Sequence, residues 1–139
     1  MIGVIFGEKG TGKTKLILDR ANKAAHEAKG SIVFIDDDNS YMYDLSTSIR
    51  FINSNDYGIH TPKMLYGFLC GITAMDFDLE YIFIDGFIAI AHHSLDTLEQ
   101  LFKDLNELAE KRNLNIILSI NGDGKNLPAT LKDIVIHTT

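Results

Sequence analysis

The sequence predicts a single α/β domain in which a mainly parallel sheet is flanked by helices. Short, apolar, β-branched runs such as residues 31–35 are typical of strands buried on both faces of a parallel sheet. Stretches with apolar residues three and four positions apart, such as residues 15–28, alternate with these runs and indicate amphipathic helices. A chain of 139 residues with 45% apolar content can form one core but not two, so residues 1–139 are expected to be one domain.

A glycine-rich loop joins the first predicted strand, residues 2–6, to the helix at 15–28. It fits the spacing G-x-x-x-x-G-K-[ST] of the phosphate-binding P-loop, or Walker A motif, at every fixed position. Glycines let successive N–H groups point inward, and the helix N-terminus adds partial positive charge. Glycine-rich loops match this spacing by chance, but the strand–loop–helix context favours phosphate binding. The expected phosphate-binding residues are Gly7, Glu8, Lys9, Gly10, Thr11, Gly12, Lys13, Thr14 and Lys15.

Three consecutive aspartates, Asp36, Asp37 and Asp38, follow the predicted strand at 31–35. Ligands of open α/β sheets lie beyond the carboxyl ends of the strands, so we expect this triplet to face the same crevice as the glycine-rich loop. Residues 39–48 are expected to be a short helix or an irregular connection. Residues 49–53 are expected to be a strand at the sheet edge.

The segment at 79–85 has the pattern of a strand that ends in a metal-binding carboxylate. It follows a loop at 54–60 and a helix from Pro62 to about Ala74, for which Thr61 is the expected N-cap. Apolar residues lead directly to Asp85, and downstream of a P-loop this pattern looks like a Walker B strand, whose aspartate holds magnesium. Many buried strands end in aspartate, so the prediction for Asp85 depends on its pairing with the loop.

The remaining segments complete the α/β pattern. An apolar connection at 86–91 leads to His92 and His93, whose adjacency does not suit metal binding, and we interpret them as a loop or helix start. A helix is expected at 95–112, and strands are expected at 114–121 and 133–137.

Polar and basic residues near the last two strands are candidates for contacts with phosphate. Ser119 and Asn121 resemble the sensor that related ATPases place near the γ-phosphate, although capping of a strand end explains them equally well. Lys125 and Lys132 are further candidates, on this subunit or on a neighbouring one.

Composition narrows the function classes. The formal charge of −6 argues against a broad electrostatic surface for nucleic acid. The single cysteine, Cys70, lies in an apolar pattern and is expected to be a small core residue. The N-terminus lacks the pattern of a signal peptide, and the longest apolar run is too short to span a bilayer. We therefore expect a cytoplasmic protein without membrane insertion.

The order of these features resembles the RecA/KaiC-like branch of P-loop ATPases, within the ASCE group, over nearly the whole chain. The most specific matches are GEKGTGKT, the acidic end of IVFIDDD, and YIFIDGFIAI followed by a long helix and IILSIN. The resemblance implies a three-layer P-loop NTPase fold, with a mainly parallel RecA-like sheet, helices on both faces, and the sensor strand between the Walker A and Walker B strands. It also implies ATP and Mg²⁺ as ligands, with Lys13 contacting phosphate and with Thr14 and Asp85 holding the metal.

The chain departs from this family where water is activated. Related enzymes commonly place a glutamate at the end of the strand after the first helix, and here Asp36 or Asp37 occupies that position, with Asp38 a less favoured choice. An aspartate is shorter by one methylene, and a displacement of about 1 Å costs roughly 10²-fold in rate. Gly86 excludes a catalytic glutamate directly after Asp85. The resemblance therefore implies slow hydrolysis.

Three functions follow, and the first is the leading hypothesis. It is a small Mg-ATP-dependent ATPase. No residue stands out as an arginine finger, and Arg20, Arg50 and Arg112 are the candidates to supply one across an interface. The resemblance implies that hydrolysis needs such a contact, so we expect self-association or a protein partner that supplies it in trans. The second is a nucleotide-dependent regulatory or adaptor subunit without turnover. The third is a small P-loop kinase, which the lack of an arginine-rich lid disfavours. Preference for ATP or GTP is not encoded in any motif.

Overall fold

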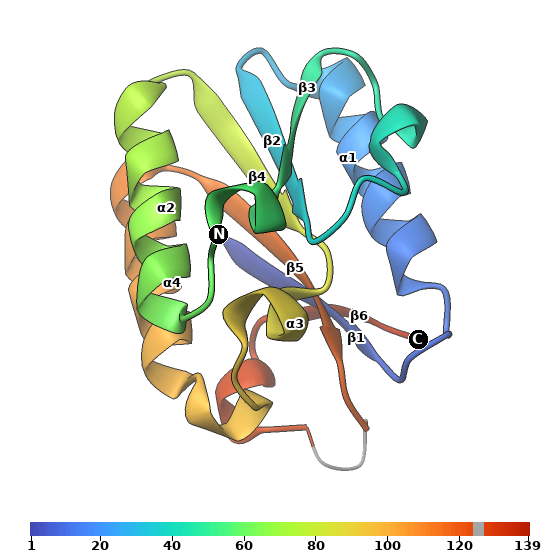
Figure 1. Cartoon of the computed structure of the whole chain (residues 1–139), viewed down its shortest axis with the longest axis vertical. Coiled ribbons are helices and arrows are strands. Elements are labelled where there is room, and N and C mark those ends of the chain that lie inside the picture. Colours follow the sequence, from blue (N-terminus) through green and yellow to red (C-terminus); the bar gives the residue numbers. More distant parts are fainter. Residues whose placement is uncertain (124–126) are drawn as a thin grey trace.

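The structure, a computed structural model, describes residues 1–123 and 127–139 (Figure 1). Within them, six parallel strands form one sheet in the order β3-β2-β4-β5-β1-β6. The strands are β1 (Ile2–Gly7), β2 (Ser31–Asp36), β3 (Ile49–Asn53), β4 (Leu79–Ile84), β5 (Asn115–Asn121) and β6 (Val135–Thr138). The predicted position of β5 between β1 and β4 is confirmed, as is the position of β3 at the sheet edge.

Helices cover both faces of this sheet. They are α1 (Lys13–Glu27), α2 (Pro62–Met75), α3 (Phe87–Ala91) and α4 (Glu99–Arg112). The apolar face of α1 packs with Phe34 and Phe83 on one face, whereas α2, α3 and α4 pack with Val33, Ile82 and Ile84 on the other. Figure 1 shows the resulting three layers, with α1 on one side of the strands and α2 and α4 on the other. Burial on both faces explains why β2 and β4 read as continuous apolar runs.

Two predicted elements differ from those observed. Residues 86–91 are not a plain connection, because they contain helix α3. His92 and His93 follow it in a loop, which is one of the two predicted alternatives. The helix predicted at 95–112 is divided into a 3₁₀ turn, Leu95–Thr97, and α4. The turn forms because the amides of Thr97 and Leu98 bond to carbonyls three residues back, which tightens the start of the helix.

Short 3₁₀ turns lie in three of the connections. Met42–Asp44 lies in the segment at 39–48, where a short helix or an irregular connection is predicted, and Ser54–Tyr57 lies in the predicted loop at 54–60. Ala129–Leu131 precedes β6. Thr61 caps α2 as predicted, since its side chain accepts a hydrogen bond from the Met64 amide and Pro62 is the first helical residue. Across the described residues, no helix combines the length and apolar character needed to cross a membrane.

The register of the sheet places the candidate site at one edge. Ile35 of β2 pairs with Ile84 of β4, and Ile84 pairs with Leu118 of β5. The next residue of each strand is therefore Asp36, Asp85 or Ser119, and these three lie side by side where the strands end. Because all strands are parallel, the loop after β1 opens at the same edge.

Candidate functional site

The loop between β1 and α1 folds back on its own backbone. Gly10 and Gly12 have positive φ angles of 82° and 93°, a conformation that side chains with a β-carbon rarely adopt. Thr11 Oγ1 donates a 2.7 Å hydrogen bond to the carbonyl oxygen of Glu8, and Lys13 Nζ donates one of 2.6 Å to the same atom. The loop thus curls around the Lys13 ammonium, as the two glycines allow.

Lys13 is a buried cation at the first position of α1. Its side chain and backbone are 6% exposed, and burial lowers the pKa of its ammonium while the charge of Asp85 opposes that change. Loss of hydration penalises the charged form of this amine, so an anion beside it would be bound favourably. The free amides at the start of α1 add to this preference because they carry the positive end of the helix dipole.

Asp85 is fixed by hydrogen bonds to both of its carboxylate oxygens. Thr14 Oγ1 donates to Oδ2 over 3.0 Å, and Ser119 Oγ donates to Oδ1 over 2.5 Å. Ser119 Oγ in turn accepts a 2.8 Å hydrogen bond from the amide of Gly86. The carboxylate is 7% exposed, so its orientation is set by α1 on one side and β5 on the other.

The aspartates after β2 form the second acidic part of the site. Asp36 is 5% exposed, and its Oδ1 accepts a 2.8 Å hydrogen bond from the Asp37 amide. The pKa of Asp36 is raised to about 8, chiefly by burial and also by the charge of Asp85, while the hydrogen bond from the Asp37 amide acts in the opposite direction. One carboxylate oxygen from each of Asp36, Asp37 and Asp38 lies within 4.8 Å of the others. With its raised pKa, Asp36 holds a proton at neutral pH.

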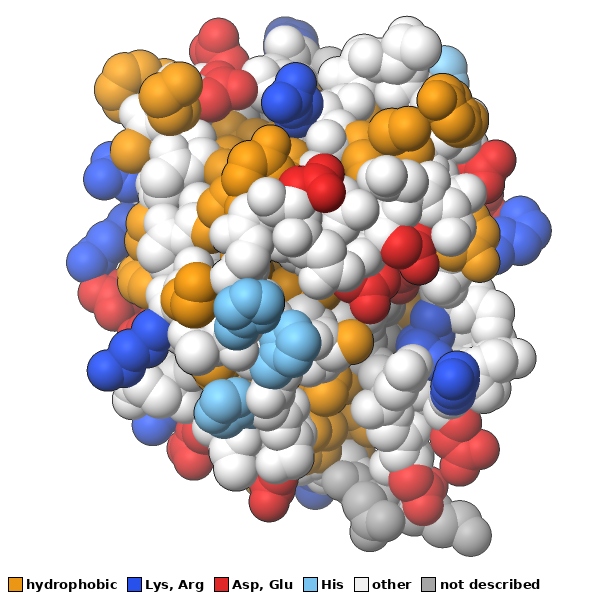
Figure 2. Space-filling view, viewed as in Figure 1, with side chains coloured by type: hydrophobic (Ala, Val, Ile, Leu, Met, Phe, Trp, Pro, Cys, Tyr) orange, Lys and Arg blue, Asp and Glu red, His pale blue; other side chains and the backbone are white. Residues whose placement is uncertain are grey.

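The loop, Asp85 and the acidic triplet share one cavity of about 410 Å³. It is lined by Lys9, Gly10, Gly12, Lys13, Thr14, Asp36, Asp37, Asp38, Tyr41, Asp85, Gly86, Ser119 and Asn121. The predicted convergence of the glycine-rich loop and the acidic triplet is therefore present in the structure. On the face seen in Figure 2, acidic and basic side chains gather around a hollow.

Four of the predicted phosphate-binding residues do not line this cavity. Gly7 is buried, and Glu8 contributes its carbonyl oxygen to the loop instead. Thr11 bonds within the loop, and Lys15 is exposed and forms a 2.9 Å ion pair with Asp19. Lys15 points away because it lies two residues into α1, on the solvent side of that helix.

Two contributors to the site carried no signal in the sequence. Tyr41 reaches the cavity from the connection after β2. Thr139 lies against the loop, where its hydroxyl contacts that of Thr11, and its amide donates a 2.9 Å hydrogen bond to the carbonyl oxygen of Phe6. Each depends on chain segments that meet only after folding.

The remaining candidate residues lie elsewhere or are not described. Lys125 lies outside the described residues, and Lys132 caps the 3₁₀ turn before β6 without lining the cavity. The rings of His60 and His92 are 5.7 Å apart at their centroids, and Figure 2 shows histidine side chains gathered on one face. In residues 1–123 and 127–139, the only group of three or more potential metal ligands that converge is the acidic triplet.

The residues present fit a magnesium-bound nucleotide. Mg²⁺ prefers oxygen ligands, and the Thr14 hydroxyl and the Asp85 carboxylate are oxygen groups held 3.0 Å apart. The glycine loop, the buried ammonium and the helix N-terminus together suit a phosphate chain. Searches against protein-family models and against curated proteins find no match to this chain. The functional argument therefore depends on the geometry of the site.

Proposed function

We propose that this chain is a Mg-ATP-binding P-loop protein of the RecA/KaiC-like kind, and that it hydrolyses ATP slowly in the cytoplasm. The observation that carries the proposal is the hydrogen bond between Thr14, at the start of α1, and Asp85, at the end of β4. Helix α1 follows β1, and β1 and β4 are not neighbours in the sheet, because β5 lies between them. A contact across that strand supports a shared metal site better than either motif alone.

Each residue has a separate role in this proposal. Lys13 and the amides of the glycine loop bind the phosphates, and Thr14 and Asp85 hold the metal, which would neutralise charge on the phosphate oxygens. Ser119 keeps the Asp85 carboxylate oriented, and Asn121 lines the same cavity. Asp36 or Asp37 orients the attacking water and accepts its proton.

Turnover in this scheme requires help from a second molecule. None of the arginines lines the cavity, although all three belong to the described residues. An arginine supplied in trans stabilises developing charge on transferred phosphate and is worth about 10³- to 10⁵-fold in rate. A second subunit or a protein partner is therefore part of the proposal.

Calorimetric titration with ATP and GTP, with and without magnesium, tests binding, and phosphate release tests hydrolysis. We expect magnesium-dependent binding and slow release, both lost in Lys13→Ala. Lys23→Ala, an exposed lysine on the same helix, is the matched control and should behave like the wild type. Absence of nucleotide binding would refute the whole proposal, whereas binding without turnover under any condition would refute hydrolysis alone.

A second candidate is a nucleotide-dependent regulatory or adaptor subunit, and the state of Asp36 favours it. With a pKa near 8 and a hydrogen bond from the Asp37 amide, Asp36 is a poor proton acceptor at neutral pH. Under this alternative, binding of a non-hydrolysable ATP analogue changes the conformation or the oligomeric state of the protein. The protein releases no phosphate from ATP. Transfer of phosphate to a nucleoside or metabolite would instead revive the kinase hypothesis, with the acidic triplet and Tyr41 at the acceptor side.

A further inference from the structure

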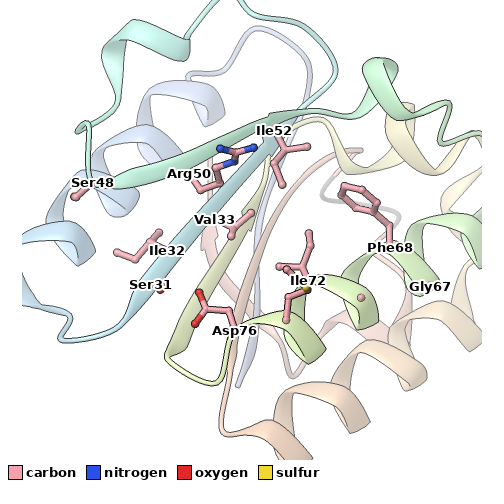
Figure 3. Close-up of a pocket in the computed structure, with 12 residues that line it drawn as sticks. Ser31, Ile32, Val33, Ser48, Arg50, Ile52, Gly67, Phe68, Ile72 and Asp76 are labelled. Atoms are coloured by element: carbon pink, nitrogen blue, oxygen red, sulfur yellow. The ribbon is translucent and has the colours of Figure 1, made fainter.

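A second hollow separates α2 from the edge of the sheet. It has a volume of about 780 Å³ and lies between β2 and β3 on one wall and α2 on the other (Figure 3). We call it the α2–β3 groove, lined by Ser31, Ile32, Val33, Ser48, Arg50, Ile52, Gly67, Phe68, Gly71, Ile72, Met75 and Asp76. None of these residues lines the phosphate cavity, so the two sites are separate.

The lining of the α2–β3 groove is mostly apolar, with one charge on each wall. Arg50 lies on the β3 wall and Asp76 lies at the end of α2, on the opposite wall (Figure 3). The Arg50 guanidinium is exposed and has no hydrogen bond or ion pair with any of residues 1–123 and 127–139. Each wall therefore carries a charge complementary to that of the other wall.

The α2 wall is also shaped for close approach. Gly67 and Gly71 are one helical turn apart, and a β-carbon built on either meets no atom within 4 Å. Small residues at this spacing let another backbone approach a helix closely. Beside them, Met75 is 88% exposed while lining the groove, and the nearby Phe77 is 95% exposed. The surface thus combines a recess with apolar side chains that project at its end.

We propose that the α2–β3 groove binds the same groove of a second copy of this chain about a two-fold axis. Such an axis exchanges the two walls, so Arg50 of each copy faces Asp76 of the other. It also brings the projecting Met75 of each copy toward the β3 wall of the other, beside Arg50 and Ile52. Both halves of the contact are present on one surface, which is the property of an isologous dimer interface, the commonest symmetry among soluble oligomers.

Sedimentation velocity over a concentration series tests the charge pairing. We expect the wild type to dimerise and Arg50→Glu and Asp76→Arg each to weaken dimerisation by about 10-fold or more, because like charges then face each other. The double variant Arg50→Glu/Asp76→Arg restores the opposite pairing and should dimerise within about 3-fold of the wild type. A wild type that stays monomeric at high micromolar concentration, or a double variant as weak as the single ones, overturns the proposal.

A substitution at Gly71 tests the groove without touching either charge. Gly71→Leu has open space in the single chain and replaces a poor helix former, so it should fold with equal or higher thermal stability. In the dimer the added side chain fills the recess, and we expect loss of dimerisation. Ala74→Leu, on the same helix but outside the groove, is the matched control. Equal dimerisation of Gly71→Leu and the wild type overturns the proposal, whatever the nucleotide assays show.

Discussion

The Thr14 hydroxyl donates a 3.0 Å hydrogen bond to Asp85 Oδ2, although the two residues are 71 positions apart in the chain. The contact spans the end of β5, whose Ser119 holds the other carboxylate oxygen. Asp85 therefore has one oxygen directed to α1 and one to β5. In this arrangement the hydroxyl and the carboxylate act as a unit, and removing one should affect the other.

The first prediction concerns that unit. Thr14→Ala should reduce magnesium-dependent ATP affinity by at least about 10-fold, because it removes one oxygen ligand and frees the Asp85 carboxylate. Affinity in the presence of a chelator should change little. Calorimetric titration of the same protein in both buffers measures the difference. Thr14→Ser keeps the hydroxyl and is the control, so a loss in Thr14→Ser as large as that in Thr14→Ala would contradict the assigned role.

The second prediction concerns Ser119. Its hydroxyl both donates to Asp85 and accepts from the Gly86 amide, and the residue is 3% exposed. Ser119→Ala should lower the free energy of unfolding by about 1–3 kcal/mol, because two partly buried groups lose their partner. Denaturant unfolding measures this change. Ser94→Ala, at an exposed loop serine, should change it by less than about 0.5 kcal/mol. Equal effects in both variants would contradict the structural role.

The strands, and the polar residues that follow them, could be predicted from the sequence. The runs in β2 and β4 are apolar because both faces are buried, and Asp36 and Asp85 follow directly, so their meeting at one edge is predictable from parallel pairing. Helix α3 was missed because it spans five residues, too few to show a helical period.

Contacts between residues far apart in the chain were also not predictable from the sequence. Thr139 meets Thr11 across 128 positions, and nothing local to either residue indicates this contact. The prediction that Lys15 binds phosphate was not supported for a different reason, since this residue does not line the cavity. It directly follows Lys13 and Thr14, which line the cavity, but α1 begins at Lys13, so helical rotation directs Lys15 toward Asp19 and solvent.

The third prediction follows from the raised pKa of Asp36. Its pKa is near 8 in the folded chain and near 4 when unfolded, so the folded state retains a proton that the unfolded state has lost between these values. The stabilisation linked to this proton is complete below about pH 4 and disappears as the pH rises through 8. Asp36→Asn keeps an acceptor for the Asp37 amide without titrating. In chelator and without nucleotide, its melting temperature relative to the wild type should rise by about 10 °C or more from pH 4 to pH 8, because a change in pKa from near 4 to near 8 corresponds to about 5 kcal/mol.

The expected curve has a definite shape that tests the assignment. The difference in melting temperature should increase between pH 4 and 8 and stay constant above that range. Asp44→Asn, at an exposed aspartate in the Met42–Asp44 turn, should show no such trend. A difference that is constant across the whole range would show that Asp36 titrates normally in the folded chain.

The last prediction concerns the reach of the acidic triplet. If Asp36 or Asp37 orients the attacking water from a position one methylene too far away, Asp36→Glu or Asp37→Glu should raise phosphate release by about 10-fold or more, since a 1 Å error costs roughly 10²-fold. The cavity of about 410 Å³ leaves room for the longer side chain. Asp44→Glu serves as the control outside the cavity. Whichever variant gains activity identifies the water-positioning residue, and if neither gains while both bind ATP normally, hydrolysis is not limited by this carboxylate and the adaptor function is favoured.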